Sequence, residues 1–255
     1  MDGQWEKCRT VLVTGANRGI GLNLVKALVN GKFTPEIIIA TARDPGGAEE
    51  LQELASKHCS IHIVKLDVID QQAIFQAVQC TSSLVGERGL NCLINNAGIN
   101  LRDSLEEVTA DTMMSNYQIN TVAPLMIIKA FLPLLRKAAK QTTGFGIGRA
   151  AVVNISSCLG SIQQTWEDGA EYRCYPYRAS KAALNMVSRC VAFDLEPEGI
   201  LCCSLHPGWV RTDMGGQEAP LGTTESVEGI LSVLGGVNRN SNSLLLDWTG
   251  QKLPW

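Results

Sequence analysis

The chain has 255 residues, of which 22 are Lys or Arg and 25 are Asp or Glu, so its formal net charge at pH 7 is −3. Hydrophobic residues make up 45% of the sequence and charged residues 18%, a balance that excludes a disordered chain. The small net charge and the lack of a basic run argue against nucleic acid or an anionic membrane as a partner.

Seven short apolar segments alternate along the chain with segments of helical periodicity. We expect strands at residues 10–14, 36–41, 61–66, 92–94, 150–155, 200–205 and 243–246. We expect helices at about 19–30, 46–57, 70–85, 105–140, 176–196 and 224–235. Strands that are apolar on both faces indicate a parallel sheet covered on both sides. The pattern therefore predicts an α/β protein: a single domain over residues 1–255, with a Rossmann-type, doubly wound parallel sheet of about seven strands.

The composition also predicts the compartment. Residues 1–9 are polar and charged, so we expect no secretory signal. The longest apolar stretch, residues 121–135, contains Lys129 and two prolines and is shorter than the ~20 residues of a membrane span. The nine cysteines are scattered, and no histidine pairs with them, so we expect free thiols, no metal site and a cytoplasmic protein without a membrane partner.

A glycine-rich turn follows the first predicted strand and opens a helix, which is the arrangement of a dinucleotide site. Glycines there allow a tight turn, a close approach of the pyrophosphate and close packing of the helix, whose N-terminus offers free N–H groups. The G-x-x-x-G-x-G spacing differs from the common G-x-G-x-x-G, so a plain turn is the alternative interpretation. The residues assigned to cofactor binding are Gly15, Asn17, Arg18, Gly19, Ile20 and Gly21.

The second predicted strand ends in a cation where proteins that bind NAD carry an acid. That acid, about 20 residues beyond the turn, holds the ribose 2′-hydroxyl. Here the strand ends in Arg43, which together with Arg18 could receive a 2′-phosphate, and this favours NADP(H) over NAD. Asp44 would compete weakly, and a merely solvated Arg43 is the alternative.

Two further strand ends carry residues that suit a cofactor. Asp67 and Val68 follow the third strand, where the adenine edge could be met. Asn96, Ala97 and Gly98 follow the fourth, where small residues let a cofactor lie against the main chain. Each of these alone would be an ordinary turn from a strand to a loop.

One of the four tyrosines, Tyr177, is followed four residues later by a lysine, Lys181. That spacing places the phenol and the ammonium on one face of a helix. A neighbouring ammonium lowers the pKa of a tyrosine from its ordinary value of about 10. Such a tyrosine can protonate a carbonyl oxygen as a hydride arrives. The pair by itself is common by chance, but Ser157, at the end of the fifth strand, could hold the same carbonyl by a hydrogen bond.

Several other polar residues are candidates for a role in the site. Asn120 lies inside the helix predicted at 105–140, where asparagine is unfavourable, so we expect a bend or a bound water there. The same argument applies to Asn116. Cys158 and Cys174 flank the tyrosine, and either could be a modifiable thiol or a packing residue.

Taken together, these motifs resemble the short-chain dehydrogenase/reductase family over nearly the whole chain. Within that family, residues 204–216 are similar to the sniffer-like and C-factor-like NADPH-dependent carbonyl reductases. The pieces that carry the family resemblance are residues 14–21, Asp67, residues 95–98, Asn120, Ser157, residues 177–181, and Pro207-Gly208 with Thr212.

The resemblance implies reduction of an aldehyde, ketone or quinone carbonyl by hydride transfer from NADPH. Tyr177 would be the general acid, with Ser157 polarising the carbonyl. Lys181 would bind the nicotinamide ribose, and Asn120 would hold a water that links Lys181 to solvent. The segment after the sixth strand would contact the nicotinamide through Pro207, Gly208, Val210 and Thr212.

Other interpretations stay open. The chain could be a dinucleotide-binding signalling or partner-binding protein of C-factor type, or an alcohol dehydrogenase that works in the oxidative direction. The predicted substrate is a small carbonyl compound, which loops at about 158–176 and 209–224 would select. The resemblance also implies a homodimer through the helices of Asn120 and Tyr177, although the Ser157–Tyr177 segment is longer than in most members and could obstruct it.

Overall fold

Seven parallel strands form the centre of the molecule in the computed structural model, which describes residues 3–32, 34–166 and 174–255. The strands are β1 (Thr10–Val13), β2 (Ile37–Ala42), β3 (Ile61–Lys65), β4 (Cys92–Asn95), β5 (Ala151–Ile155), β6 (Leu201–His206) and β7 (Leu245–Asp247). Their order in the sheet is β3-β2-β1-β4-β5-β6-β7, and each neighbouring pair is parallel. The predicted doubly wound parallel sheet is therefore confirmed, with each strand within two residues of its expected bounds.

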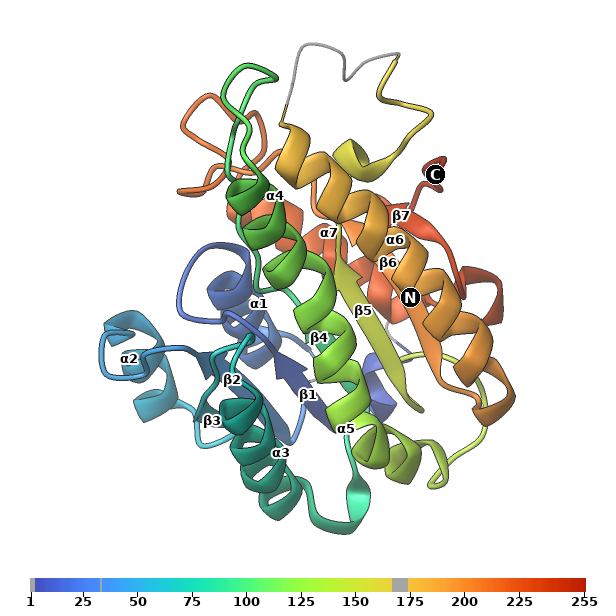
Figure 1. Cartoon of the computed structure of the whole chain (residues 1–255). Coiled ribbons are helices and arrows are strands. Elements are labelled where there is room, and N and C mark those ends of the chain that lie inside the picture. The colour runs from blue at the N-terminus through green and yellow to red at the C-terminus, as the bar shows by residue number, and fades with distance from the viewer. Residues whose placement is uncertain (1–2, 33, 167–173) are drawn as a thin grey trace.

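Helices lie on both faces of the sheet (Figure 1). They are α1 (Gly19–Asn30), α2 (Glu49–Lys57), α3 (Gln71–Val85), α4 (Ala110–Tyr117), α5 (Ala123–Ala139), α6 (Tyr175–Leu195) and α7 (Thr223–Gly236). The helix expected at 105–140 begins at Ala110, because the Thr109 hydroxyl caps it by accepting a hydrogen bond of 3.1 Å from the Thr112 N–H. A π-helical turn, Gln118–Val122, joins α4 to α5 and takes the place of the bend expected at Asn120.

Two hydrophobic cores cover the two faces of the sheet. One contains side chains of α1, α2 and α7, such as Leu24, Leu51 and Ile230. The other contains side chains of α3, α5 and α6, such as Ile74, Phe131 and Leu195. The central strands are apolar toward both cores, and every residue of β1, β2, β4 and β5 is buried. The edge strand β3 is partly exposed.

The run from Ala110 to Ala139 forms 30 residues of continuous helix, and by length and composition alone it could cross a membrane. The apolar stretch expected at residues 121–135 lies inside this longer run, which α4 and the π-helical turn extend toward the N-terminus. Half of its most apolar window is buried inside the protein. Its inner side chains, including Ile127 and Leu135, belong to the core under α5.

The sheet order reverses between β1 and β4, which positions the candidate site. The chain runs outward from β1 through β2 to β3, returns to β4 beside β1, and continues outward to β7. Connections that leave in opposite directions open a crevice at the carboxyl ends of these two strands. The loops after β4, β5 and β6 lie at that same edge of the sheet (Figure 1).

Candidate active site

The glycine-rich turn between β1 and α1 has the backbone that its glycines permit. Gly15 has a φ of 63° and Gly19 a φ of 56°, values that side chains with a Cβ rarely adopt. A Cβ atom at Gly21 would collide with the main-chain oxygen of Gly15 and with the Asn96 side chain. The third glycine is therefore required for α1 to pack closely against the turn.

The N-terminus of α1 has no side-chain cap. Arg18 is the N-cap residue, and its side chain accepts no hydrogen bond from the first turn. The first N–H groups of a helix need an acceptor from elsewhere, and together with the helix dipole they favour an anion. Asn17 and Arg18 are exposed beside this end, and Gly19 and Ile20 are partly exposed. The turn can thus hold a pyrophosphate.

The loop after β4 is tied to the glycine-rich turn. The Thr14 hydroxyl accepts hydrogen bonds from the N–H groups of Asn96 (2.9 Å) and Ala97 (3.0 Å). The Asn96 amide donates to the main-chain oxygens of Thr14 (2.9 Å) and Gly15 (3.1 Å). Asn96 and Ala97 therefore position the turn itself, a structural role that the sequence analysis did not anticipate for them.

The two arginines assigned to the 2′-phosphate differ in their surroundings. Arg18 forms an ion pair of 2.9 Å with Asp213, and both side chains are about three-quarters exposed. Arg43 is exposed just after β2. Asp44 accepts a hydrogen bond of 3.1 Å from the Gly46 N–H, so its carboxylate serves the next turn of the chain.

The residues after β3 are partly buried. Asp67 accepts a hydrogen bond of 3.2 Å from the Ile69 N–H through one carboxylate oxygen. Val68 packs against the core under α3 and α5. Both lie at the same sheet edge as the glycine-rich turn, one strand beyond Arg43.

The segment after β6 approaches the glycine-rich turn from the opposite side of the crevice. A Cβ atom at Gly19 would lie 3.6 Å from the Cγ2 atom of Thr212, so the two loops are adjacent. The Thr212 hydroxyl accepts a hydrogen bond of 3.1 Å from the Gly215 N–H. Pro207 and Val210 are buried, and Gly208 has a φ of 87°.

The Tyr177 hydroxyl is hydrogen-bonded to the Ser157 side chain. Ser157 follows β5 and Tyr177 lies in the first turn of α6, so the hydroxyl groups come from two different elements. Ser157 also caps the short turn Cys158–Gly160 by accepting a hydrogen bond of 3.1 Å from the Leu159 N–H. The sequence-predicted pair is thus brought together.

Lys181 is also brought to this point, and it is buried. Its Nζ atom lies 5.6 Å from the centre of the Tyr177 ring and donates a hydrogen bond of 2.7 Å to the main-chain oxygen of Ile155. Burial of the ammonium lowers the pKa of Lys181 to about 8. A Cβ atom at Gly98 would lie 3.9 Å from this Nζ atom, so the loop after β4 faces the same group.

The expected lowering of the tyrosine pKa is not found. Burial raises the pKa of Tyr177 above its ordinary value, and the hydrogen bond to Ser157 opposes this only in part. The Lys181 ammonium donates its hydrogen bond to the Ile155 carbonyl. Tyr177 is therefore protonated at neutral pH, which is the form that can donate a proton.

Asn120 is fully buried in the π-helical turn, and its side chain has three partners. Its oxygen accepts from the Ile99 N–H (2.9 Å), while its amide donates to the Ile99 carbonyl (2.8 Å) and to the Ser180 hydroxyl (3.0 Å). Asn120 therefore joins the loop after β4 to α6. Asn116 makes a weaker contact with the same loop, accepting from the Leu101 N–H at 3.4 Å.

The predicted substrate loops lie above these residues, although residues 167–173 of the first are outside the described structure. Arg102, in the loop after β4, donates a hydrogen bond to the main-chain oxygen of Met214, so it links two loops across the site. Cys174 is buried and Cys158 partly buried, and burial raises the pKa of both thiols, so neither is activated.

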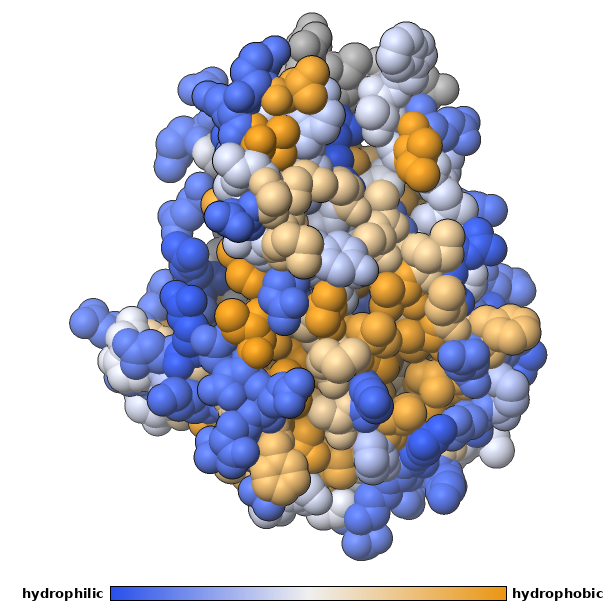
Figure 2. All heavy atoms as spheres, in the orientation of Figure 1, coloured by the Kyte–Doolittle hydropathy of each residue, from blue (hydrophilic) through white to orange (hydrophobic). Residues whose placement is uncertain are grey.

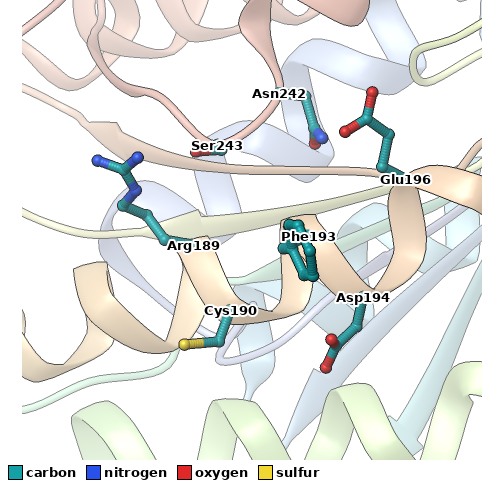
Figure 3. A pocket seen from close by; sticks show the side chains of 7 residues that line it. All are labelled: Arg189, Cys190, Phe193, Asp194, Glu196, Asn242 and Ser243. Carbon is teal, nitrogen blue, oxygen red and sulfur yellow. The ribbon is translucent and has the colours of Figure 1, made fainter.

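A hollow in the described residues lies away from this site. It measures about 440 Å³, is open to solvent, and is formed by the C-terminal half of α6 and the segment before β7 (Figure 3). Phe193 and Arg189 point into it from α6, opposite Asn242 and Ser243. None of the predicted site residues lines it, so it has no part in the candidate site.

Two residues that support the site were missed in the sequence. The Ser180 hydroxyl accepts from the Asn120 amide and donates to the Tyr177 carbonyl (2.7 Å). The Asn185 side chain is buried between α6 and the end of β5. Both are polar residues on the inner face of α6, four residues or fewer from Tyr177 or Lys181, and that periodicity was the signal that could have revealed them.

Comparison with known proteins is consistent with this geometry. A family model described as short chain dehydrogenase matches residues 9–220. The carbonyl reductase Sniffer of D. melanogaster is similar, with 41% identity and a TM-score of 0.93, over 97% of this chain and 99% of that chain. An NADPH-bound carbonyl reductase from chicken fatty liver shows 44% identity and a TM-score of 0.93, over 97% and 99%. The C-signal protein of Myxococcus xanthus is 40% identical over 167 residues, which are 65% of this chain and 93% of that protein.

Proposed function

The chain belongs to the short-chain dehydrogenase family, a family of oxidoreductases, and we propose that it reduces the carbonyl group of an aldehyde, ketone or quinone with NADPH. The observation that carries this proposal is the contact between the hydroxyl groups of Tyr177 and Ser157 beside the buried Lys181. These three groups lie at the same sheet edge as the glycine-rich turn.

The residues at that edge fit NADP(H). The uncapped N-terminus of α1 and the turn from Gly15 to Gly19 would hold the pyrophosphate. Arg43 stands where a ribose-binding acid would stand in a protein that binds NAD, while Asp44 is used by the next turn. Two NADP(H)-containing relatives among the similar structures support the same cofactor. When bound, the cofactor would supply the hydride.

The chain's own groups would handle the proton. Tyr177, protonated at neutral pH, would donate its proton to the carbonyl oxygen as negative charge develops there. Ser157 would donate a hydrogen bond to the same oxygen, a neutral form of oxyanion stabilisation. The existing contact between the two hydroxyls supports this, because an oxygen atom in contact with one would lie near the other.

Lys181 and Asn120 would serve the cofactor and the proton supply. The Lys181 ammonium would bind the nicotinamide ribose hydroxyls, after releasing the Ile155 carbonyl. The Asn120 side chain is occupied by Ile99 and Ser180. We therefore assign the water-holding role to the main-chain oxygen of Asn120, which lies in the π-helical turn.

The test is to incubate the purified protein with NADPH and a panel of aldehydes, diketones and quinones, and to follow loss of NADPH absorbance. Turnover with at least one class is expected, and the rate with NADH should be at least about tenfold lower. The reaction should also be run with NADP⁺ and the corresponding alcohols, which tests the oxidative direction. Absence of turnover in both directions, with NADPH bound, would overturn the proposal.

A signalling role is a second candidate, favoured by the 40% identity to the C-signal protein. In that case the dinucleotide site would act as a sensor and catalysis would be dispensable. A Tyr177→Phe protein decides between the two roles: a partner-binding function would survive the loss of the proton donor, and a reductase function would not.

We also infer a homodimer in the cytoplasm. The nine cysteines are all free thiols, as expected in a reducing compartment. Apolar side chains gather over α5 and α6 (Figure 2). The hollow of about 290 Å³ between these helices is lined by apolar residues such as Leu125, Leu132 and Val191, with the charged residues Lys129, Arg136, Asp194 and Glu198 beside them. A second copy would cover this face. Light scattering should give twice the chain mass, and Leu132→Lys, in the lining of this hollow, should reduce it to the monomer.

A further inference from the structure

A pair of buried polar side chains joins α6 to the end of β5. The Ser156 hydroxyl donates a hydrogen bond of 2.6 Å to the Asn185 side-chain oxygen. The Asn185 amide donates in turn to the main-chain oxygen of Gly160, at 3.4 Å. Ser156 and Asn185 are both buried, and Ser156 is itself anchored to β6 by its N–H, which donates to the Leu205 carbonyl at 2.8 Å.

This pair joins the two elements that carry the groups that would react. Ser156 directly precedes Ser157 in the chain, and Asn185 lies one helical turn after Lys181 and two turns after Tyr177. The helix backbone also touches the short turn after β5, because a Cβ atom at Gly160 would lie 2.7 Å from the main-chain carbon of Lys181. The distance between the Ser157 and Tyr177 hydroxyls therefore depends on how α6 is seated at this point.

The polar contact that Lys181 makes at this point is not a permanent one. Lys181 donates to the Ile155 carbonyl, but the same ammonium is needed for the ribose in the proposed function. It also loses its proton above its lowered pKa of about 8. The contact between Ser156 and Asn185 involves neutral groups, so it is independent of both pH and cofactor.

We propose that Asn185, acting through Ser156, is the positioning residue that holds Tyr177 in register with Ser157. Neither Asn185 nor Ser156 would touch substrate or cofactor. The proposal rests on the proposed reductase function. Misplacement of reacting groups by about 1 Å can reduce a rate by about 100-fold, so loss of this contact should reduce kcat and leave the NADPH dissociation constant unchanged.

The experiment compares Ser156→Ala, Asn185→Ala and the double variant with the wild-type enzyme. We expect each single variant to lower kcat by about 10- to 100-fold, with little change in NADPH affinity. The kcat of the double variant should equal that of the less active single variant, because each single substitution already removes the same contact. Ser156→Thr, which keeps the hydroxyl, should restore most of the activity, and it also covers the case in which Asn185→Ala fails to fold.

Ser188→Ala is the matched control. Ser188 lies on the same face of α6, and its hydroxyl accepts a hydrogen bond of 2.8 Å from the Asn154 amide on β5, one turn farther from Tyr177. This variant should lower the melting temperature by an amount similar to Ser156→Ala, while kcat stays within about twofold. If the role of Asn185 were purely structural, Ser156→Ala and Ser188→Ala would have similar kcat values.

The pH profile supplies a second readout. Loosening α6 should admit water to Lys181, so the alkaline limb of the kcat profile should move to higher pH in Ser156→Ala and stay in place in Ser188→Ala. Wild-type kcat in Ser156→Ala, with an unmoved limb, would overturn the positioning role while leaving the reductase function intact. An inactive wild-type enzyme would instead overturn the function itself.

Discussion

The Nζ atom of Lys181 donates a hydrogen bond of 2.7 Å to the main-chain oxygen of Ile155, the last residue of β5. A buried ammonium is thereby held at the carboxyl end of the sheet, one helical turn from the Tyr177 phenol. The contact satisfies one N–H of the ammonium, and burial without an anion explains why its pKa is low. The pH dependence of the enzyme follows from this arrangement.

Turnover should depend on the Tyr177 hydroxyl. In Tyr177→Phe the aromatic ring stays in place and only the proton donor is lost, so kcat should fall by about 100- to 10,000-fold. NADPH binding, measured by fluorescence titration, should change by less than about twofold, because the phenol contributes no charge at neutral pH. Retention of wild-type turnover would contradict the assignment of the general acid.

Carbonyl reduction should slow as the pH rises through about 8. An amine is charged below its pKa, so Lys181 carries its proton at pH 7 and loses it above about 8. Tyr177 cannot account for a limb at that pH, since its pKa is raised above 10. If only the enzyme with a charged Lys181 is active, kcat/KM should fall about tenfold per pH unit above the pKa of this lysine.

Lys181→Arg tests this assignment of the limb. A guanidinium keeps its charge throughout the accessible range, with a pKa above about 12. The variant should be slower but should show no limb near pH 8. A limb at an unchanged pH in this variant would assign the titration to another group.

Selectivity for NADPH should depend more on Arg43 than on Arg18. Arg18 is already paired with Asp213, whereas Arg43 stands alone at the end of β2 among the residues whose contacts the structure describes. A hydrogen bond between charged groups contributes about 1.5–3 kcal/mol, so Arg43→Asp should reduce the NADPH/NADH ratio of kcat/KM by about tenfold or more. Arg18→Ala should have a smaller effect, and Asp44→Asn, which alters a carboxylate used by Gly46, should leave the ratio unchanged.

Stability should decrease above pH 9 because of buried thiols. Burial raises the pKa of Cys203 from its ordinary 9.0 to about 12, and it also raises the pKa values of Cys8, Cys92 and Cys202. The unfolded chain therefore loses these protons first. Their stabilising contribution is complete below pH 9 and is lost as the pH rises from 9 toward 12.

At pH 10, ionisation of each such thiol in the unfolded chain should lower the free energy of unfolding by about 1.4 kcal/mol. Urea denaturation under reducing conditions, at about pH 8 and about pH 10, measures the loss. Cys203→Ala should show a smaller loss than the wild type. Cys190→Ala removes an exposed thiol and should show the wild-type loss, so equal behaviour of the two variants would refute the explanation.

The secondary structure and the sheet edge of the site were predictable because both depend on local patterns. Apolar β-branched runs and helical periodicity fixed the alternation of strands and helices, and glycines at Gly15, Gly19 and Gly21 indicated the turn. Parallel strands place their carboxyl ends together, so Ser157 and Asp67 could be assigned to one edge. The helix expected at 105–140 begins five residues later, at Ala110, because Thr109 caps it there.

By itself, then, the sequence determined the fold class, the family and the residues gathered at the crevice, since each of these is encoded in short motifs and their order. Only the tertiary structure decided what those residues contact. Arg18 meets Asp213, Asn120 meets Ser180, and Ser156 meets Asn185, pairs that lie 195, 60 and 29 residues apart in the chain. The direction in which the pKa of Tyr177 shifts was decided in the same way. Burial and the orientation of Lys181 are properties of the packed molecule, and they cannot be read from the spacing of residues in the chain.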